Sequence, residues 1–408
     1  MNVRLFFIYK LIKDLVPIYP VYLLLFESKG LTLAQISLLL AIWSVAVVLL
    51  EVPSGILADH WNRKNMILIG GLCKVGCYIF WFFSEGFVLY ALGFILWGIS
   101  ESFCSGSEEA LLYDNLKLQG QEESFDKVYG KGNFYASIGV ALSCLIGGFL
   151  SVLITFKGVL LLSVFSVLIS TFFASKLKEV NYFKIQQDEN REKDSFRLFA
   201  TMVDAVTLCI KNRLLLIVIL MLVLVIGTAG ILDEYDSLIA KSYGLNLELI
   251  GVWICIRYIL EAIGGRFAYL YKKLFIKIGI KKEFYSIFLL CIFAGICLAI
   301  SVSIHSIALV PLYGLFYMFM ASAGILQEEY IQKRIDEQGR STVHSIISLL
   351  HNLYGITFFS VFALVISGSS IQLTILMIAL YIIILSVVLG LMHRLITKKD
   401  IGISVGTH

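Results

Sequence analysis

The acidic side chains that could do chemistry in this sequence lie inside long apolar runs. In the run 87–113, Glu101, Ser105 and Glu108 are spaced i, i+4 and i+7, so a helix would place them on one face. Ionising a carboxyl group in apolar surroundings costs several kcal/mol, so such a group is largely protonated at rest. We therefore expect Glu101, near the middle of the run, to carry a proton, with Ser105 and Glu108 beside it in a polar cavity.

A second carboxyl group, Asp14, lies in the first apolar run, 5–26, four residues after Lys10. On a helix these two side chains can meet across one turn. The pair either neutralises itself and stabilises the helix, or Asp14 takes part in binding protons or a solute. Pro17 and Pro20 follow in the same run. Because proline removes a backbone donor, we expect this helix to bend along a cavity wall.

The second half of the sequence carries a similar charged pair, Arg257 and Glu261, four residues apart in the run 247–271. Mutual neutralisation and a role in a polar cavity are both open interpretations of this pair. Asp233, Glu234 and Asp236 lie near the end of the run 214–239. They form either a vestibule for cations or a solvated helix end, and we favour the solvated end.

Other charged residues lie near the ends of apolar runs, where they could hold helix ends together. Asp114 is expected level with Arg63 and should form a structural ion pair with it. Glu328 lies at the end of the run 306–331, close to Lys333, and is expected to belong to a set of gate ion pairs. Lys74, within the run 66–84, has no explanation in the sequence beyond a buried partner.

The elements that carry these residues are long apolar helices. The chain has 408 residues, of which 59% are hydrophobic and 15% charged, and its mean hydropathy is +0.88. A soluble protein has about a quarter of its residues charged, whereas a membrane-spanning helix needs about 20 apolar residues. We predict an all-α polytopic membrane protein with twelve such segments: 5–26, 32–57, 66–84, 87–113, 130–153, 158–176, 214–239, 247–271, 284–303, 306–331, 343–366 and 371–393.

The sequence also predicts two similar halves. The predicted parts are a six-helix bundle over 1–176, a linker over 177–212, a second bundle over 213–395 and a tail over 396–408. A weak internal repeat supports the division, because four residues recur 210 positions later: Trp43, Glu51, Gly55 and Arg63 correspond to Trp253, Glu261, Gly265 and Lys273. The linker is rich in charge, which is typical of a solvated connection.

The orientation follows from the basic residues of the connections. The connections on one side of the predicted helices contain only Lys29, Lys157 and Lys241, whereas those on the other side and the two termini are rich in lysine and arginine. Cytoplasmic loops carry the excess of basic residues. We therefore expect both termini and the linker to be cytoplasmic, in the cytoplasmic membrane of a bacterium.

The connection between the second and third segments has the most specific pattern. The residues that match G-x-L-A-D-x-x-x-R-K are Gly55, Leu57, Ala58, Asp59, Arg63 and Lys64. This connection resembles the signature loop of the major facilitator superfamily, although Asn62 stands where a glycine is common. The resemblance implies two pseudo-symmetric six-helix bundles and a gating role for the loop, with Glu51 preceding it. Gly55 should let the helices approach closely, and Asp59 should pair with Arg63 or cap the next helix.

Two further stretches resemble one branch of that superfamily. The run from Ser105 to Asp114 is similar to the S-G-x-x-E-A-L-x-Y-D stretch of drug/proton antiporter-like exporters, and Glu51-x-Pro53 fits the loop variant of clostridial-type tetracycline pumps. The stretch beginning at Arg340 resembles the R-A-T-x-x-S start of the eleventh helix in drug exporters. The resemblance implies proton-coupled efflux and a gating role for Arg340.

We therefore expect a secondary transporter that moves a small organic solute by alternating access, most plainly the proton-coupled efflux of a drug-like or amphiphilic compound. The alternatives are proton- or sodium-coupled transport of a metabolite or siderophore in either direction, a polytopic membrane enzyme, and a receptor that has lost transport. No nucleotide-binding loop is present in the sequence. We expect no catalytic residues, no cofactor, no metal and no nucleic-acid partner, and a monomer that exchanges solute and protons within the lipid bilayer.

Overall fold

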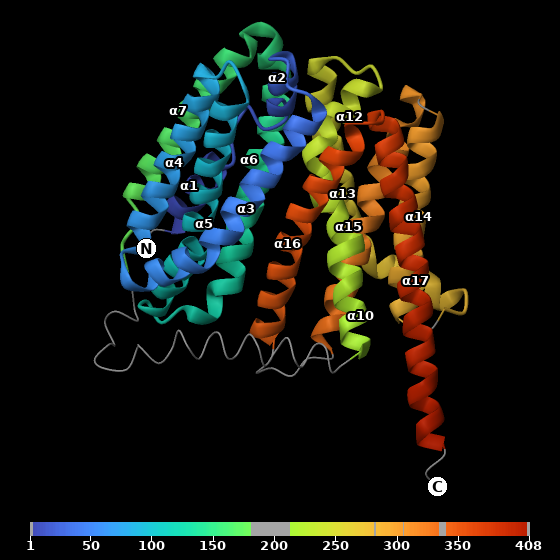
Figure 1. The fold of residues 1–408 in the computed structure, drawn as a ribbon. Coiled ribbons are helices and arrows are strands. Elements are labelled where there is room, and N and C mark those ends of the chain that lie inside the picture. The colour runs from blue at the N-terminus through green and yellow to red at the C-terminus, as the bar shows by residue number, and fades with distance from the viewer. Residues whose placement is uncertain (1–2, 181–212, 281–282, 305, 334–339, 406–408) are drawn as a thin grey trace. The chain divides into compact units, whose positions relative to one another are not determined.

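The computed structural model describes residues 3–180, 213–280, 283–304, 306–333 and 340–405, most of which are helical (Figure 1). The main helices of these ranges are α1 (Val3–Lys13), α2 (Tyr22–Ser28), α3 (Leu33–His60), α4 (Arg63–Phe83), α5 (Phe87–Lys117), α6 (Phe125–Leu153), α7 (Thr155–Ser175), α10 (Arg213–Met221), α11 (Gly227–Leu232), α12 (Asp236–Ser242), α13 (Leu247–Lys277), α14 (Glu283–Ile304), α15 (Val310–Gln332), α16 (Arg340–Ile366) and α17 (Ile371–Val405).

Ten segments in the described ranges are long and apolar enough to cross a membrane. The first and eighth predicted segments do not meet this criterion of length and hydropathy, each for a physical reason. The first is divided between α1 and α2, and α13 carries Arg257, Glu261 and Arg266 in its middle. With these two included, each of the twelve predicted segments corresponds to helical structure, the first of them in two pieces, and the prediction of an all-α membrane protein is confirmed.

The first segment differs from the single bent helix predicted over 5–26. The helix ends at Lys13 and resumes at Tyr22, so the chain leaves the helical conformation around Pro17 and Pro20. The released backbone groups are satisfied by serine hydroxyls of neighbouring helices, as apolar surroundings require. The Ile18 N–H donates to Ser163 at 3.0 Å, and Ser143 donates to the Asp14 carbonyl at 3.0 Å.

The seventh segment is continuous but irregular. A π-turn at Leu222–Ile226 separates α10 from α11, and a 3₁₀ turn at Asp233–Tyr235 separates α11 from α12. π-turns inside helices are frequent at functional sites, and 3₁₀ stretches within a helix often mark a functional hinge. The last segment also departs from prediction, since α17 continues to Val405 where a tail was expected from 396.

Contacts divide the chain into two compact units. The first contains Met1–Glu189, Asn246–Cys255 and Gly355–Ser367, and the second contains Asn190–Leu245, Ile256–Tyr354 and Gly368–His408. In the first unit an aromatic core joins Tyr22, Phe26, Trp81, Phe94 and Trp97. The boundary predicted at 177–212 stays a prediction, because residues 181–212 lie outside the described ranges.

Candidate functional site

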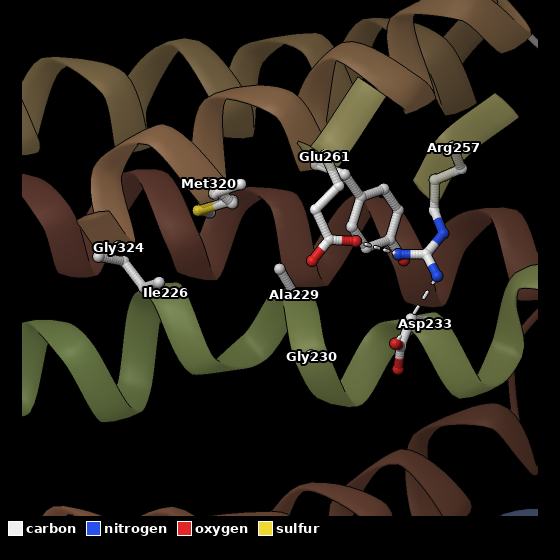
Figure 2. A pocket seen from close by; sticks show the side chains of 10 residues that line it. Ile226, Ala229, Gly230, Asp233, Arg257, Glu261, Met320 and Gly324 are labelled. Carbon is white, nitrogen blue, oxygen red and sulfur yellow. Dashed lines mark hydrogen bonds and ion pairs between the residues drawn. The ribbon is translucent and has the colours of Figure 1, made fainter. Parts of the chain in front are cut away.

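The centre of the candidate site in the second unit is Arg257 of α13, whose side chain is almost completely buried. Three carboxyl groups surround its guanidinium group. The Nε atom lies 2.7 Å from Oδ2 of Asp236, Nη1 lies 2.8 Å from Oε2 of Glu261, and Nη2 lies 3.8 Å from Oδ2 of Asp233. Figure 2 shows Glu261 and Asp233 on either side of the guanidinium group. Four charged groups, three acidic and one basic, therefore meet inside membrane-spanning helices.

The other oxygen of Asp236 is bound by two tyrosines of α15. Tyr313 and Tyr317 donate to Oδ1 at 2.6 and 2.8 Å. The guanidinium group of Arg257 also lies over the rings of Tyr258 and Tyr317, at 3.8 and 4.5 Å from their centroids. A buried charge is tolerated only when it is paired and hydrogen-bonded. Asp236 and Arg257 meet both conditions, so the solvated helix end favoured from the sequence is wrong for Asp236, which is 2% exposed.

A pocket of about 130 Å³ lies beside this cluster. Its walls come from the seventh segment, α13 and α15, and Asp233, Glu261 and Arg257 lie at one end. The side chains of Asp233 and Glu261 remain 25% and 42% exposed, whereas those of Arg257 and Asp236 are sealed at 2% and 3%. Ile226 and Met320 supply apolar surface. The pocket thus combines an apolar wall with two accessible carboxyl groups.

Small residues leave room for this pocket and hold its walls together. A side chain added at Gly230 would meet no described atom within 4 Å, so this glycine opens the space between the walls. At Gly264 of α13 an added side chain would overlap the backbone of Met318 in α15. Ser322 of α15 donates to the Gly264 carbonyl at 2.8 Å. This close approach of α13 and α15 sets the position of Arg257 along its helix relative to Tyr317 of α15.

In the first unit, Glu108 of α5 is the centre of a second cluster. Its carboxylate accepts hydrogen bonds from Tyr9 at 2.7 Å, from Lys10 at 3.2 Å, and from Lys13. The pair expected between Lys10 and Asp14 is therefore replaced by pairs from Lys10 and Lys13 to Glu108. No ion pair to Asp14 occurs among the residues whose side chains are described, and its side chain is half-buried.

The expected polar face of α5 is divided. Glu108 is buried at 4%, whereas Glu101 and Ser105 lie on the surface of the first unit. At 100° per residue, Glu101, Ser105 and Glu108 lie on a similar side of α5. The lysines of α1 cover only the end of this face that carries Glu108. Glu101 accepts a hydrogen bond from the indole N–H of Trp43 at 3.2 Å. It is consequently the accessible carboxyl group of this face.

Lys74, unexplained in the sequence, is 9% exposed and lies against aromatic rings. Its ammonium group is 3.0 Å from the ring centroid of Trp97, and 5.4 and 5.8 Å from those of Tyr19 and Tyr78. The buried partner expected from the sequence is thus an aromatic face. No ion pair to Lys74 is recorded within the described ranges.

The ion pair predicted between Arg63 and Asp114 is present, with both side chains buried. Arg63 also donates to the Ala110 carbonyl at 2.9 Å. The N-terminus of α4 is capped by Glu179, which accepts from the backbone N–H groups of Arg63 and Lys64 at 3.1 and 2.7 Å. Sequence reasoning did not identify Glu179, since it lies 115 residues downstream of Lys64.

The connection itself is shorter than expected, because α3 continues to His60 and α4 begins at Arg63. Gly55 and Asp59 therefore lie in the last turns of α3. The side chain of Asp59 is outside the described part of the chain, so its partner stays a prediction. A side chain added at Gly55 would meet no described atom within 4 Å, so the close approach expected at this glycine stays a prediction. Glu51 is exposed on the same helix.

The second unit has a network of ion pairs at the ends of α13, α14 and α15. Lys272 lies 2.7 Å from Glu329 and 3.0 Å from Glu283, and Lys333 lies 2.6 and 2.8 Å from the same carboxylates. These bonds raise the pKa of Lys333, which follows the end of α15. Glu328 accepts a hydrogen bond from Gln332 at 2.7 Å. The side chain of Arg340 lies outside the described residues.

The sequence matches the family model described as Major Facilitator Superfamily over residues 6–359. The chain belongs to the major facilitator superfamily. This membership places it among multi-pass membrane transport proteins rather than among enzymes. A curated relative of the superfamily, the uncharacterized transporter YxaM of Bacillus subtilis strain 168, is 26% identical over 200 residues, which are 49% of each chain. The matched region thus spans about half the length of that relative.

Solved structures of several transporters resemble this fold. The nucleoside transporter NupG superposes with a TM-score of 0.74 at 15% identity, covering 96% of this chain and 99% of that one. A bacterial homologue of the lysosomal transporter Spinster gives a TM-score of 0.70 at 13% identity, covering 96% of each chain. The peptide-family transporter PepTSo gives 0.69 at 12% identity, covering 97% and 98%. At these identities the likeness establishes the major facilitator fold and no substrate.

Proposed function

We propose that this chain is a secondary transporter that exports a small amphiphilic organic solute in exchange for protons. It works as a single chain by alternating access, with both termini on the cytoplasmic side. The observation that carries the proposal is the excess of carboxyl groups inside the membrane-spanning helices of a major facilitator protein. In the second unit Asp233, Asp236 and Glu261 meet one Arg257.

Such an excess supports coupling for an electrostatic reason. Three carboxylates and one guanidinium group would carry a net charge of −2 in low-dielectric surroundings, where like charges repel strongly. A bound proton or a cationic group of the solute lowers that repulsion, and the two compete for the same carboxyl oxygens. Binding one species then favours release of the other, which is the thermodynamic basis of exchange.

Glu101 of the first unit is proposed as a main proton site. Its carboxyl group lies on the surface of that unit, and the indole of Trp43 fixes its orientation at 3.2 Å. Ser105 lies one turn away on the same accessible face. Asp14, which makes no described ion pair, is proposed to assist. Glu108 has a different role, because it forms ion pairs with two lysines of α1 and thereby connects α1 to α5.

The proposed cycle uses the proton gradient as its energy source. Loss of the proton from Glu101 toward the cytoplasm creates an anionic site that attracts the solute. Protonation from the outside neutralises the site and releases the solute there. The membrane potential adds about 2.3 kcal/mol per charge per 100 mV when net charge moves. Exchange of one proton for one monovalent cation moves no net charge and would use the pH difference alone, whereas exchange of two protons would also use the potential.

The proposal is tested with purified protein in proteoliposomes, using ethidium as an amphiphilic probe and an imposed pH gradient. Wild-type protein should accumulate ethidium against its gradient, and Glu101→Gln should abolish accumulation while leaving downhill exchange partly intact. Glu123→Gln, which removes an exposed carboxyl group beyond α5, is the matched control and should transport normally. Normal accumulation by Glu101→Gln, or accumulation that persists after the pH gradient and potential are dissipated, would overturn proton coupling through Glu101.

A further inference from the structure

We infer that the pocket of the second unit, between α11, α13 and α15, binds the ammonium group of a compact organic cation. Its accessible carboxylates, Asp233 and Glu261, would receive the charged group, and the apolar wall around Ile226 and Met320 would receive the hydrocarbon part. The inference rests on the proposed function for its role in transport, but the binding it describes can be measured without transport.

The charges of the pocket favour a cation over an anion. Arg257 is the basic residue of the pocket wall, and its guanidinium group is already neutralised by Asp236 in a pair that is closed to solvent. The rings of Tyr258 and Tyr317 also lie against the guanidinium group, and the side chain of Arg257 is only 2% exposed, so it offers little surface to an anionic ligand. Asp233 and Glu261 therefore remain as a surplus of two carboxylates on the accessible part of the wall. A carboxylate or phosphate ligand would be repelled from this wall.

The two carboxylates also have free hydrogen-bonding capacity. Asp233 lies 3.8 Å from Nη2 of Arg257, which is longer than a hydrogen bond. Glu261 binds Nη1 through Oε2 alone, so its Oε1 is available to a donor from the pocket. An ammonium group has three donors and no acceptor, which matches a wall of carboxylate oxygens. The two acidic side chains come from different helices, so a single ammonium group could bridge the seventh segment and α13.

The shape of the pocket limits the apolar part of the ligand. Its volume is about 130 Å³, and Ile226, Ala229, Met320 and Gly324 contribute apolar lining. A methionine adapts to varied apolar ligands, because its side chain is unbranched and polarizable. Gly230 faces open space, so any larger residue there would occupy the volume of the ligand. The site thus fits one ring or a short alkyl chain attached to an ammonium group.

Binding is tested by calorimetry of the full-length protein in nanodiscs, with three probes that share one apolar group. 2-Phenylethylammonium is positively charged, 2-phenylethanol is neutral and 3-phenylpropanoate is negatively charged. We expect the cation to bind at least tenfold more tightly than the alcohol, and the anion to give no binding heat. Asp233→Asn and Glu261→Gln should each weaken binding of the cation about tenfold or more.

Two further variants separate loss of the site from loss of the fold. Glu248→Gln removes a carboxyl group from the first turn of α13 that does not line the pocket, and should bind 2-phenylethylammonium as the wild type does. Gly230→Leu keeps every charge but fills the pocket, and should abolish binding with an unfolding temperature close to that of the wild type. Equal binding of the cation and the anion, or binding that survives Asp233→Asn, Glu261→Gln and Gly230→Leu, overturns the inference.

Transport measurements on the same variants, reconstituted into proteoliposomes, distinguish this inference from the proposed function. Proton-driven accumulation of ethidium together with 2-phenylethylammonium binding that is indifferent to all three pocket variants would refute the pocket and leave the transporter intact. Conversely, pocket-dependent binding of 2-phenylethylammonium without proton-driven transport of either cation would refute the proposed coupling and support the pocket.

Discussion

Lys74 shows how a single charged residue is accommodated inside this protein. Its ammonium group lies 3.0 Å from the centroid of Trp97 and is nine-tenths buried. The face of an indole ring carries partial negative charge, and a desolvated cation–π contact stabilises a protein by about 2 kcal/mol. The contact offsets part of the cost of removing an ammonium group from water.

We therefore predict an energetic coupling between Lys74 and Trp97. In a double-mutant cycle, Trp97→Leu should cost about 2 kcal/mol less in the Lys74→Met background than in the wild type. The free energy of unfolding in detergent, followed by far-ultraviolet circular dichroism, provides the measurement. Phe94→Leu, which alters a ring stacked on Trp97, is the comparison and should show little coupling to Lys74. Additive effects of Lys74→Met and Trp97→Leu would contradict a cation–π contact.

At the scale of elements, the break between α1 and α2 depends on a neighbouring helix. Gly147 of α6 lies so close to the carbonyl of Pro17 that an added side chain would overlap it, and Pro20 is 2.8 Å from the same position. Serines of α6 and α7 satisfy the backbone groups that the break releases. The first segment is therefore shaped by its prolines and fixed in place by small and hydroxyl-bearing residues of α6 and α7.

We predict that Gly147→Ala lowers stability by about 1–3 kcal/mol, the usual cost of overpacking a well-filled interior. Gly130, on the same helix, faces open space, so Gly130→Ala should be neutral or stabilising by about 1 kcal/mol because alanine favours helix. Thermal unfolding of the two variants measures the difference. Equal unfolding temperatures for Gly147→Ala and Gly130→Ala would show that the break tolerates a bulkier neighbour.

The elements were largely predictable because lipid imposes a simple rule. Apolar runs of about 20 residues must be helical in a bilayer, and the predicted segments correspond to the observed helices. The departures occur where backbone details decide the outcome. Two prolines interrupt the first helix between Lys13 and Tyr22, and the π-turn at Leu222–Ile226 has no periodic signal in a uniformly apolar run.

The candidate site was predictable only in its charged residues. Arg257 and Glu261 are four residues apart, so their pairing follows from helix geometry. Asp236 and Tyr313 are 77 residues apart, and no local pattern indicates that they meet. The same holds for Trp43 with Glu101 and for Lys74 with Trp97, since tertiary packing brings an aromatic ring to a charge. Charged residues in apolar runs identify the site, whereas their aromatic partners require the fold.

At the scale of the whole molecule, the signature loop is expected to govern the rate of conformational exchange. Arg63 is held by Asp114 and by the Ala110 carbonyl, all within the first unit. We predict that Arg63→Ala and Asp59→Asn slow transport about tenfold or more while leaving the affinity for solute nearly unchanged. Initial transport rates and binding constants in proteoliposomes measure the two quantities. Lys127→Ala is the matched control, and a loss of affinity at unchanged rate would refute this role of the signature loop.

The predicted orientation can be tested without knowing the solute. Cysteines introduced at Asn190 and His305, in a variant without reactive native cysteines, should react differently with a membrane-impermeant maleimide applied to intact cells. The cysteine at 305 should be labelled from outside and the one at 190 only after the cells are permeabilised, because the basic connections face the cytoplasm. Labelling at 190 in intact cells would reverse the assigned orientation of the whole chain.

The hydrogen bond from Trp43 to Glu101 has a spectroscopic consequence. The protein has five tryptophans, at positions 43, 61, 81, 97 and 253, and Trp43 is bonded through its indole nitrogen to the proposed proton site. Indole fluorescence shifts in wavelength with the charge beside the ring. In a chain in which Trp43 is the sole tryptophan, the emission wavelength would therefore depend on the protonation of Glu101. Proton binding at Glu101 could then be followed as a shift in the intrinsic fluorescence, without any added dye.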